Sequence, residues 1–460
     1  MTGRYKAYPE YKDSGVEWLG EIPSHWDSWK LKHCLKSALQ YGANEAALDD
    51  DKNDPRYIRI TDMNEDGTLR VDTFKSLPLL TAKDYLLSDG DILLARSGAT
   101  VGKSFLYKDS FGISCFAGYL IKASCENKIL IPSYAYWFFQ SDQFWKYISG
   151  SQIQSTIQNV SAEKYGEMKL SFSECIQEQQ QITDFLDHET AKIDTLITKQ
   201  EQLIELLKEK RQAVISHAVT KGLNPDAPMK DSGVEWLGQV PEHWEVAPLK
   251  YLCTFSGGGT PSKENLSYWT DGTIPWVSPK DMKIFRITKT QDYITEKALL
   301  ESSTNLVAEG ALLMVVRSGI LQRNIPIAIN DVKVTLNQDM KALRFNKRID
   351  VEYAANFILG NVAALLLDWS KEGATVESIE HEYLSNGQIA VPPLDEQQTI
   401  IFELEKSNQY FDQLEMKATA GIELLKERKT ALISAAVTGK IDVRDWHIST
   451  VENGATVQIS

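Results

Sequence analysis

A long internal duplication is the strongest constraint on the fold of this chain. Residues 12–26 read KDSGVEWLGEIPSHW and residues 230–244 read KDSGVEWLGQVPEHW, so twelve of fifteen positions are identical. The same offset of 218 residues aligns residues 204–220 with residues 422–438. Solenoid repeats have much shorter periods and stack directly on their neighbours. The duplication therefore predicts two globular domains joined by two similar connectors.

Between the near-identical segments lie two longer stretches that have diverged from each other. Short aliphatic runs, at residues 57–60, 91–95 and 311–316, indicate strands, and residues 134–148 indicate a helix. We expect an α+β protein with two small α/β domains related by a pseudo-two-fold axis. The expected segments are an N-terminal segment (1–24), a first domain (25–175), a central helix (176–222), a linker (223–242), a second domain (243–392), a C-terminal helix (393–442) and a tail (443–460).

Both connectors have the pattern of long helices. Apolar residues recur along residues 178–221 at spacings of three, four and seven, which is typical of one helix face. No glycine or proline interrupts this stretch before Gly222, and the second copy closes at Gly439, where glycine can terminate a helix. About 44 residues at ~1.5 Å each make a rod on the order of 65 Å. Such a rod cannot bury its apolar face alone. We therefore expect the helices to pair antiparallel as a coiled coil, with polar Gln200 at the seam or at a solvated edge.

Composition narrows the class of protein. Of 460 residues, 43% are hydrophobic and 24% are charged, which excludes wholesale disorder. No apolar run approaches the roughly 20 residues that cross a bilayer, and the N-terminus lacks the apolar segment of a signal peptide, so a cytoplasmic protein is expected. The five cysteines contain no CxxC pair and the seven histidines no HxxxH or HExxH cluster, which argues against a disulfide framework and against a metal site.

Two glycine-rich segments look like nucleotide-binding loops, but turns explain both better. Residues 98–104 (GATVGKS) have three residues between their glycines, whereas a P-loop needs four. Residues 255–259 (FSGGG) match the F-x-G-x-G pattern of S-adenosylmethionine sites, but Pro261 follows where a helix should begin, and the companion catalytic tetrapeptide is missing. Two E-x-K tripeptides, at 167–169 and 427–429, lack a convincing acidic partner. We expect a chain without catalytic residues.

The repeated motifs resemble the specificity subunit of a type I restriction-modification enzyme over essentially the whole chain. The motifs that carry this resemblance are KDSGVEWLG (12–20 and 230–238), Glu178-Gln179-Gln180, PPLDEQQ (392–398) and the two similar helix endings. Gly258–Pro261 and Ile274–Val277 also resemble the opening of that family's target-recognition domains. The first copy departs from the pattern by reading Glu174-Cys175-Ile176 where the second has the proline pair.

This resemblance implies a non-catalytic DNA-recognition subunit. Each divergent block would be a target-recognition domain for one half of a bipartite, asymmetric site on double-stranded DNA. The helices would set the gap and dock two modification (methyltransferase) subunits, which restriction (motor-nuclease) subunits would join. This chain would hold no cofactor, because S-adenosylmethionine, ATP and Mg would belong to its partners. The alternatives are a free-standing S-adenosylmethionine-dependent DNA adenine methyltransferase and a coiled-coil adaptor that does not bind DNA.

Candidate site residues follow from this implication. Phosphate contacts need cations, and base readers should be side chains that the two halves do not share. Arg96-Ser97-Gly98 and Arg317-Ser318-Gly319 align as repeat equivalents, so a shared phosphate role and a structural salt bridge are both open for their arginines. DNA-binding candidates are Arg56, Arg59, Arg96, Lys103, Gln152 and Gln154 in the first domain and Lys263, Lys280, Arg317 and Arg323 in the second. Candidates for partner docking and for the spacer are Glu178, Gln179, Leu186, Ile193, Leu207, Glu396, Gln397, Leu404, Leu414 and Leu425.

The net charge of −14 by itself argues against nucleic-acid binding, because phosphate contacts need positive charge. The distribution of this charge along the chain weakens that argument. Residues 25–170 hold 17 basic and 18 acidic side chains, and residues 243–390 hold 15 and 17, so both domains are nearly neutral. Residues 174–222 and 395–442, which cover the helices, hold 6 basic and 9 acidic side chains each. We therefore expect the isolated chain to bind DNA weakly, with the partner subunits supplying much of the attraction for phosphates.

Overall fold

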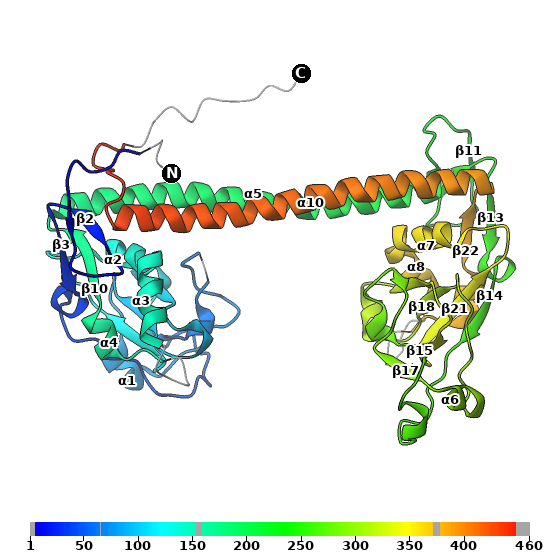
Figure 1. Ribbon diagram of the computed structural model, residues 1–460, viewed down its shortest axis with the longest axis horizontal. Helices are drawn as coiled ribbons and strands as arrows, with labels where there is room; N and C mark the ends of the chain where they lie inside the picture. The colour runs from blue at the N-terminus through cyan, green and yellow to red at the C-terminus, as the bar shows by residue number, and fades with distance from the viewer. Residues whose placement is uncertain (1–4, 65, 153–158, 371–377, 448–460) are drawn as a thin grey trace. The chain divides into compact units, whose positions relative to one another are not determined.

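The structure, a computed structural model, describes residues 5–64, 66–152, 159–370 and 378–447 (Figure 1). The chain divides into two compact units. Unit 1 comprises Met1–Gln200 and Ala420–Ser460, and unit 2 comprises Glu201–Thr419. Because the division falls inside both long helices, each unit contains the first part of one helix and the last part of the other. Each unit is thus assembled from segments that are far apart in the sequence.

Unit 1 is built on a four-stranded antiparallel sheet of order β4-β9-β6-β7. Its strand β6 (ILLA) is buried at every residue, as a continuous apolar run predicts for a strand covered on both faces. The pairs β5-β8 (parallel), β3-β10 and β1-β2 (both antiparallel) complete the unit. The strands are β1 Tyr11–Asp13, β2 Glu21–Pro23, β3 Trp26–Lys30, β4 Gln40–Tyr41, β5 Arg56–Ile58, β6 Ile92–Ala95, β7 Ser104–Leu106, β8 Ser114–Phe116, β9 Leu120–Ala123 and β10 Lys169–Ser173. The α-helices are α1 Leu79–Ala82, α2 Pro132–Phe138, α3 Asp142–Gln152, α4 Ala162–Glu167 and the start of α5 Ile176–Lys221.

Unit 2 repeats this plan with additions. Its main sheet has the order β14-β21-β18-β19-β16, and a second sheet has the order β17-β15-β20. The pairs β13-β22 and β11-β12 correspond to β3-β10 and β1-β2, whereas β16 and β17 have no counterpart among the described strands of unit 1. The strands are β11 Met229–Asp231, β12 Gln239–Pro241, β13 Glu245–Pro248, β14 Cys253–Gly257, β15 Ile274–Val277, β16 Arg286–Ile287, β17 Asp292–Ile294, β18 Leu312–Val315, β19 Ile327–Asn330, β20 Thr335–Leu336, β21 Met340–Phe345 and β22 Gln388–Val391. The α-helices are α6 Glu296–Glu301, α7 Val351–Gly360, α8 Val362–Trp369, α9 His381–Asn386 and the start of α10 Leu394–Val437.

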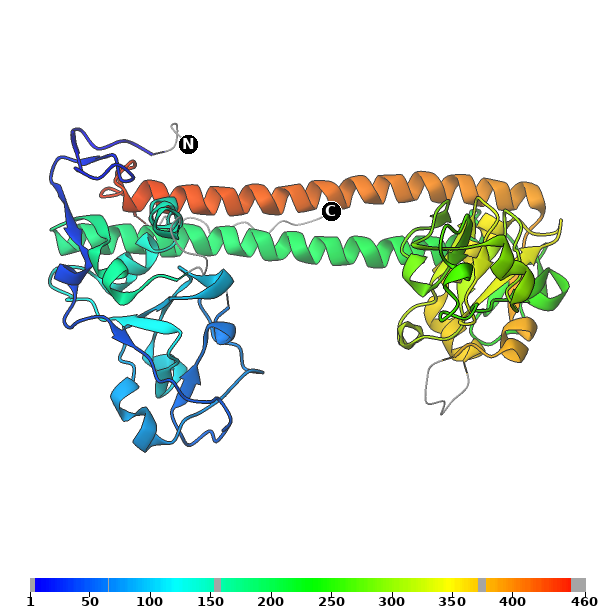
Figure 2. The same ribbon diagram turned by 60° about the horizontal axis from the view of Figure 1, so that its bottom comes forward.

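The two connectors are the long helices α5 and α10, close to the expected bounds. Both end at a glycine with positive φ, Gly222 at 78° and Gly439 at 69°, where a residue with a side chain is strained. Within each unit the helices lie side by side (Figures 1 and 2). They run antiparallel, since in unit 2 Arg211 lies beside Asp412 while Gly222, further along α5, lies beside Glu396, nearer the start of α10.

Two equivalent ion pairs join the helices. In unit 2, Arg211 Nη2 lies 2.5 Å from Asp412 Oδ1. In unit 1, Lys429 Nζ lies 2.7 Å from Asp194 Oδ1. Each residue of one pair is the repeat counterpart of a residue in the other, so the two units use the same helix register. Gln200 is half-buried and therefore lies neither fully in the seam nor fully in solvent.

Two local expectations are wrong. Residues 134–148 form two helices rather than one, because Ser141 Oγ accepts a hydrogen bond from the Phe144 N–H (3.3 Å) and caps α3 as a new helix. The strand expected at residues 57–60 ends at Ile58. A 3₁₀ helix follows it at once, held by the Asp62 carboxylate, which accepts a hydrogen bond from the Arg59 N–H.

Within the described residues, no single helix is long and apolar enough to cross a bilayer. Helices α7 and α8, bent by 90°, meet the length and composition test only as a pair, and most of α7 is buried in the core of unit 2.

Candidate nucleic-acid interface and helix anchors

The glutamine of the Glu-Gln pair that opens each long helix belongs to the interior of its unit. Gln179 is fully buried, and its Oε1 accepts a hydrogen bond from the Ile131 N–H (2.9 Å). Its Nε2 donates to the carbonyls of Ile129 and Ser173 (2.8 Å each). Gln397 repeats all three bonds in unit 2 and is also fully buried. Both amides therefore fasten the first turn of a long helix to its domain. The partners of Gln397 are the Asp350 N–H (2.7 Å) and the carbonyls of Arg348 (3.0 Å) and Pro392 (2.8 Å).

The preceding glutamate binds the duplicated His-Trp pair. Buried Glu178 accepts hydrogen bonds from the Tyr8 hydroxyl (2.7 Å) and from Trp26 Nε1–H (3.0 Å), and its Oε2 lies 3.0 Å from His25 Nε2. Although burial raises the pKa of Glu178, hydrogen bonds from these three residues and from Ser173 bring that pKa below its ordinary value. The carboxylate is thus held ionised beneath the domain.

The equivalent glutamate of unit 2, Glu396, has a weaker version of this anchor. It accepts a hydrogen bond from Trp244 Nε1–H (3.1 Å) and lies 2.7 Å from His243 Nε2, but its side chain is 29% exposed. The 218-residue offset places Asp226 where unit 1 has Tyr8. The contact between the His-Trp and Glu-Gln motifs was not predicted from the sequence. The sequence did contain one indication of this contact, because both motifs recur at the same offset of 218 residues. Two segments that are duplicated together can be parts of one contact.

These contacts change the interpretation of the docking candidates. The buried positions hold the helices to each other and to the domains, so a docking face has to consist of the half-buried candidates and of exposed residues beside them. Among the exposed large apolar side chains of α5 and α10 within the described residues, only Leu206 and Leu424 are repeat counterparts. The buried candidates are Glu178, Gln179, Leu186, Ile193, Gln397 and Leu404, and the half-buried ones are Leu207, Leu414, Leu425 and Glu396.

The basic candidates of unit 1 are already engaged within the unit. Each of their contacts fixes the side chain and, except for the stacked Arg96, uses part of its N–H donors, so fewer remain for a phosphate. The contacts are Arg59 Nη2 with Asp62 Oδ1 (2.8 Å), Lys103 Nζ with the Met63 carbonyl (2.7 Å), Arg56 Nη2 with the Arg70 carbonyl (2.5 Å), and the Arg96 guanidinium over the Tyr41 ring (4.8 Å from the centroid).

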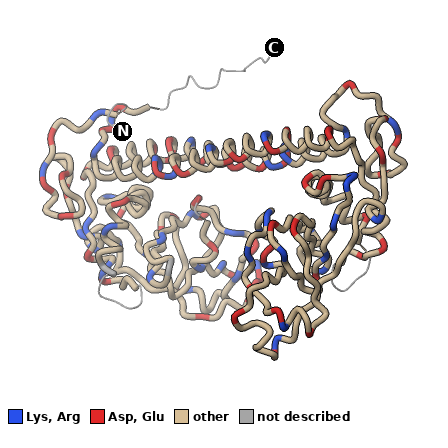
Figure 3. Tube along the Cα trace, turned by 45° about the vertical axis from the view of Figure 1, so that its right-hand side comes forward, with Lys and Arg blue, Asp and Glu red and all other residues tan. Residues whose placement is uncertain are grey.

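The basic candidates of unit 2 are free by comparison. Lys263, Lys280, Arg317 and Arg323 are exposed, and no described residue forms a hydrogen bond or ion pair with their charged groups. Arg323 differs from the others in lining a groove of about 650 Å³ together with residues of both long helices. No single-sign stripe marks the helices, along which Lys and Arg are interspersed with Asp and Glu (Figure 3).

The alignment of the two Arg-Ser-Gly tripeptides suggests that they are structurally equivalent. In the structure they instead lie one residue out of register with each other. Strands β6 and β18 equate Arg96 with Val316 and Ser97 with Arg317. Because successive side chains of an extended chain point to opposite faces, the two arginines lie on opposite faces of their sheets. This register argues against a shared role for the two arginines. The register follows from the pairing of Ala95 with Leu120 and of Val315 with Met340, and from the N–H groups of Arg96 and Val316, which bond the carbonyls of Tyr119 (3.0 Å) and Asp339 (2.8 Å).

Two candidate base readers cannot be placed. Gln152 is the last residue of α3, and its side chain lies outside the description, as does Gln154 altogether.

Close packing restricts two of the three glycines in residues 255–259: Gly259, whose Cβ would lie 2.8 Å from Ser303 Oγ, and Gly258, the variable position of the F-x-G-x-G pattern. A Cβ on Gly258 would lie 1.9 Å from the Asn337 carbonyl oxygen. Gly42, its counterpart in unit 1, meets the Ala117 carbonyl oxygen in the same way, at 2.3 Å. Glycine is thus required by the neighbouring strand, without any ligand. Residues 98–104 likewise form a turn with a short 3₁₀ helix, where a P-loop would open an α-helix.

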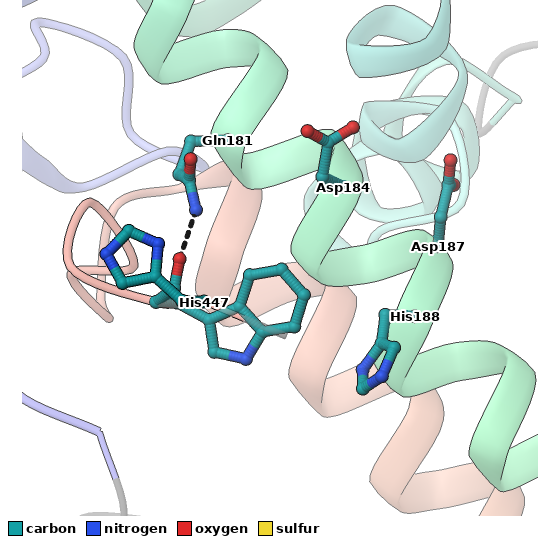
Figure 4. Close-up of a pocket in the computed structure, with 6 residues that line it drawn as sticks. Gln181, Asp184, Asp187, His188 and His447 are labelled. Atoms are coloured by element: carbon teal, nitrogen blue, oxygen red, sulfur yellow. Dashed lines mark hydrogen bonds between the residues drawn. The ribbon is translucent and has the colours of Figure 1, made fainter. Parts of the chain in front are cut away.

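A cleft of about 590 Å³ lies near the start of α5 in unit 1 (Figure 4). The Gln181 amide donates a hydrogen bond to the Trp446 carbonyl, so the tail forms one wall. Burial raises the pKa of Asp187, although Trp137 Nε1–H donates a hydrogen bond to its carboxylate (2.8 Å). No group of three or more His, Cys, Asp or Glu residues in the described part of the chain is placed to hold a metal ion. The cleft is lined by Gln181, Asp184, Asp187, His188, Trp446 and His447.

Residues 23–206 and 241–424 each match the family model described as type I restriction modification DNA specificity domain. The chain therefore belongs to this family and contains two copies of its domain. The two matches cover the anchors and most of both long helices.

Similar proteins agree with this membership. The EcoR124I/EcoR124II specificity subunit of Escherichia coli is 39% identical over 195 residues, which are 42% of this chain and 44% of that protein. The MjaIX specificity subunit of Methanocaldococcus jannaschii is 29% identical over 39% of this chain and 40% of its own length, so these two matches span less than half of either relative. The MjaVIII specificity subunit of the same organism is 22% identical over 92% of this chain and 95% of its own length.

Two solved structures share the fold. One, from a study of complex assembly and conformational transition of the type I R-M system, has a TM-score of 0.69 at 14% identity and covers 91% of this chain and 99% of its own. The other, the HsdS subunit of Thermoanaerobacter tengcongensis, has a TM-score of 0.55 at 15% identity and covers 91% of this chain and 98% of its own.

Proposed function

We propose that this chain is the sequence-specificity subunit of a type I restriction-modification complex, in which each domain reads one half of a bipartite, asymmetric site on double-stranded DNA. The observation that carries this proposal is the pair of family domains that share one plan and one helix anchor but differ in their cationic side chains. Two different readers suit two different half-sites, as the domains of a dimeric DNA-binding protein suit half-sites related by its symmetry.

The long helices would form a coiled-coil spacer that sets the gap between the half-sites and docks two modification subunits. In support, α5 and α10 each continue without a break from one unit into the other, and equivalent ion pairs join them in both units. S-adenosylmethionine, ATP and Mg would be bound by the modification subunits and by restriction subunits that join them. The free-standing methyltransferase has less support, because Pro261 follows the F-x-G-x-G segment where a helix should begin and the companion catalytic tetrapeptide is missing.

Exchange of residues 25–175 for the corresponding block of a divergent relative is the direct test. We expect one half of the methylated sequence to change while the other half and the gap stay the same. Sequencing of methylated adenines in cells that carry the complete system measures this. A change in both halves, or in neither, would contradict the modular proposal.

A second test separates the two Arg-Ser-Gly arginines. In the assembled complex, we expect Arg317→Ala to weaken binding to all DNA sequences alike. Because one phosphate contact is lost, the fall of log K with log salt should become less steep by about one. Arg96→Ala should leave that slope unchanged and cost about 0.5–1 kcal/mol of stability through the lost contact with Tyr41. Fluorescence titrations of labelled DNA at several salt concentrations measure the slopes.

The control for the register is Ser97→Arg. This variant puts a cation at the position in unit 1 that corresponds to Arg317. It should make the fall of log K with log salt steeper by about one. Equal losses for Arg96→Ala and Arg317→Ala would show that the alignment of the tripeptides, rather than the strand register, reflects their roles.

A further inference from the structure

We infer that Arg96 reads a guanine of the half-site bound by unit 1, with its guanidinium oriented by the ring of Tyr41. Tyr41, Arg96 and Tyr119 together are named the aromatic–arginine cluster. The inference rests on the proposed function, because it names a base that the first domain would recognise. It gives Arg96 a role different from the phosphate contact expected of Arg317.

The cluster lies at the surface end of one face of the main sheet of unit 1. Tyr41 pairs with Ile121 across β4 and β9, and Ile121 pairs with Leu94 across β9 and β6. Paired residues, and residues two apart on one strand, have side chains on the same face, so Arg96 and Tyr119 also lie on this face. The two aliphatic residues are fully buried, whereas Tyr41 is 40% exposed and Tyr119 is 64% exposed. The buried row of this face therefore ends in a cation and two aromatic rings at the surface.

The contacts of Arg96 orient its guanidinium but leave its donors unused. The guanidinium carbon lies 4.8 Å from the centroid of the Tyr41 ring, within the range of a cation–π contact. The Tyr41 hydroxyl accepts a hydrogen bond from the Ala162 N–H (3.0 Å) at the start of α4, which fixes the ring. No described residue forms a hydrogen bond or ion pair with the guanidinium, and its Nε is buried without a partner. The terminal nitrogens Nη1 and Nη2 are therefore the donors that remain for a ligand.

Among the base edges in the major groove, guanine suits this arginine best. Guanine presents two adjacent acceptors, O6 and N7, to which one guanidinium can donate two hydrogen bonds. Adenine presents an acceptor beside a donor, and arginine has no acceptor to offer that donor. Stacking on an aromatic ring orients the planar guanidinium in advance, so less side-chain freedom is lost when both bonds form.

The cluster is present in one domain only, which favours a base contact over a phosphate contact. Phosphates are alike in every half-site, whereas base readers have to differ between two different half-sites. By strand register, unit 2 has neither the arginine nor the two rings at the corresponding positions. The counterparts are Val316 for Arg96, Asp339 for Tyr119 and Gly257 for Tyr41.

Methylation by the complete system is the first test. Sequencing of methylated adenines with the unchanged chain gives both half-sites, and the exchange of residues 25–175 shows which half belongs to unit 1. With Arg96→Ala we expect one guanine position of that half to accept other bases, while the other half stays the same. Arg96→Gln should lose the guanine preference as well, because an amide matches the acceptor and donor of adenine rather than two acceptors.

Binding by the assembled complex then identifies the base atom. Two duplexes are compared that differ only in having guanine or 7-deazaguanine, which lacks the N7 acceptor, at the relaxed position. We expect the unchanged chain to bind the 7-deazaguanine duplex at least about 5-fold more weakly, and Arg96→Ala to bind both duplexes alike. Arg96→Ala should lose roughly 5- to 150-fold in affinity for the guanine duplex, with an unchanged salt slope.

The matched control is Arg70→Ala. Arg70 is an arginine of unit 1 whose side chain is 49% exposed but paired with Asp72 (3.1 Å), so this variant should leave both half-sites unchanged. A half-site of unit 1 without guanine, or one that neither Arg96 variant changes, would overturn the inference and leave the proposed function standing. If Arg96→Ala weakened binding to both duplexes equally and made the salt dependence less steep, the contact would be to a phosphate and the inference would be wrong. The absence of a bipartite methylated sequence with the unchanged chain would instead overturn the proposed function.

Discussion

Gly258→Ala is expected to unfold the second domain, whereas Gly257→Ala, one residue earlier, is expected to be nearly neutral. A Cβ at position 258 would lie 1.9 Å from the Asn337 carbonyl oxygen and 2.5 Å from that of Leu336. Both obstacles are backbone atoms of the chain that leads into β21, so a side-chain rotation cannot relieve them. Overpacking commonly costs about 1–3 kcal/mol, and we expect more than ~3 kcal/mol here.

Gly257 is the matched control because a Cβ there meets nothing within 4 Å. Alanine at this position should change the free energy of unfolding by less than about 1 kcal/mol, with a gain possible from reduced freedom of the unfolded chain. Urea unfolding followed by tryptophan fluorescence suits both variants, since Trp276 Nε1–H donates to the Gly259 carbonyl (3.1 Å) beside the site. Equal stability of the two variants would contradict the steric explanation.

Glu178→Leu should destabilise unit 1 by about 3–5 kcal/mol. The substitution leaves the Tyr8 hydroxyl and the buried Trp26 N–H without an acceptor, and each unsatisfied buried donor costs about 1–3 kcal/mol. Glu178→Gln, which keeps an oxygen acceptor, should cost less. Glu396→Leu is the comparison in unit 2 and should cost less than Glu178→Leu, because Glu396 is more exposed and Asp226 stands where unit 1 has Tyr8.

The stabilisation by Glu178 should also depend on pH with a definite sign. The pKa of Glu178 is lower in the folded chain than its ordinary value. A lowered carboxyl pKa stabilises the fold above the ordinary pKa, and this stabilisation is lost as the pH falls through the folded-state pKa. The stability difference between the unchanged chain and Glu178→Gln should therefore be constant near neutrality and shrink below about pH 4. Thermal unfolding of both chains from pH 7 to pH 3 measures this. A difference that grows with acidity would refute the assignment.

Features that depend on local pattern were predictable from the sequence. The spacing of apolar residues indicated α5 to within two residues of its observed start, and the glycines after each last turn marked where the helices end. These are short-range properties, because a helix bonds each residue to a neighbour four positions away. The candidate cations were found by residue type, but residue type alone did not separate engaged cations from free ones.

Features that depend on partners distant in the chain were not predictable. Arg96 and Arg317 stand in identical tripeptides, yet the pairing of β6 with β9 and of β18 with β21 places them one residue apart. A shift of one residue exchanges the two faces of a strand. Identity of a short sequence motif therefore does not determine the face to which its arginine points.

The sequence by itself therefore determined the duplication, the two helices with their ends and the family. All of these can be recognised from residue identities at fixed offsets and from helical periodicity. Only the tertiary structure decided that the glutamates of the Glu-Gln motifs bind the His-Trp pairs, that the glutamines are buried, and that Leu206 and Leu424 face solvent. The physical reason is that side-chain burial and hydrogen-bond partners depend on segments distant in the chain, as in the contact of Trp26 with Glu178, 152 residues away.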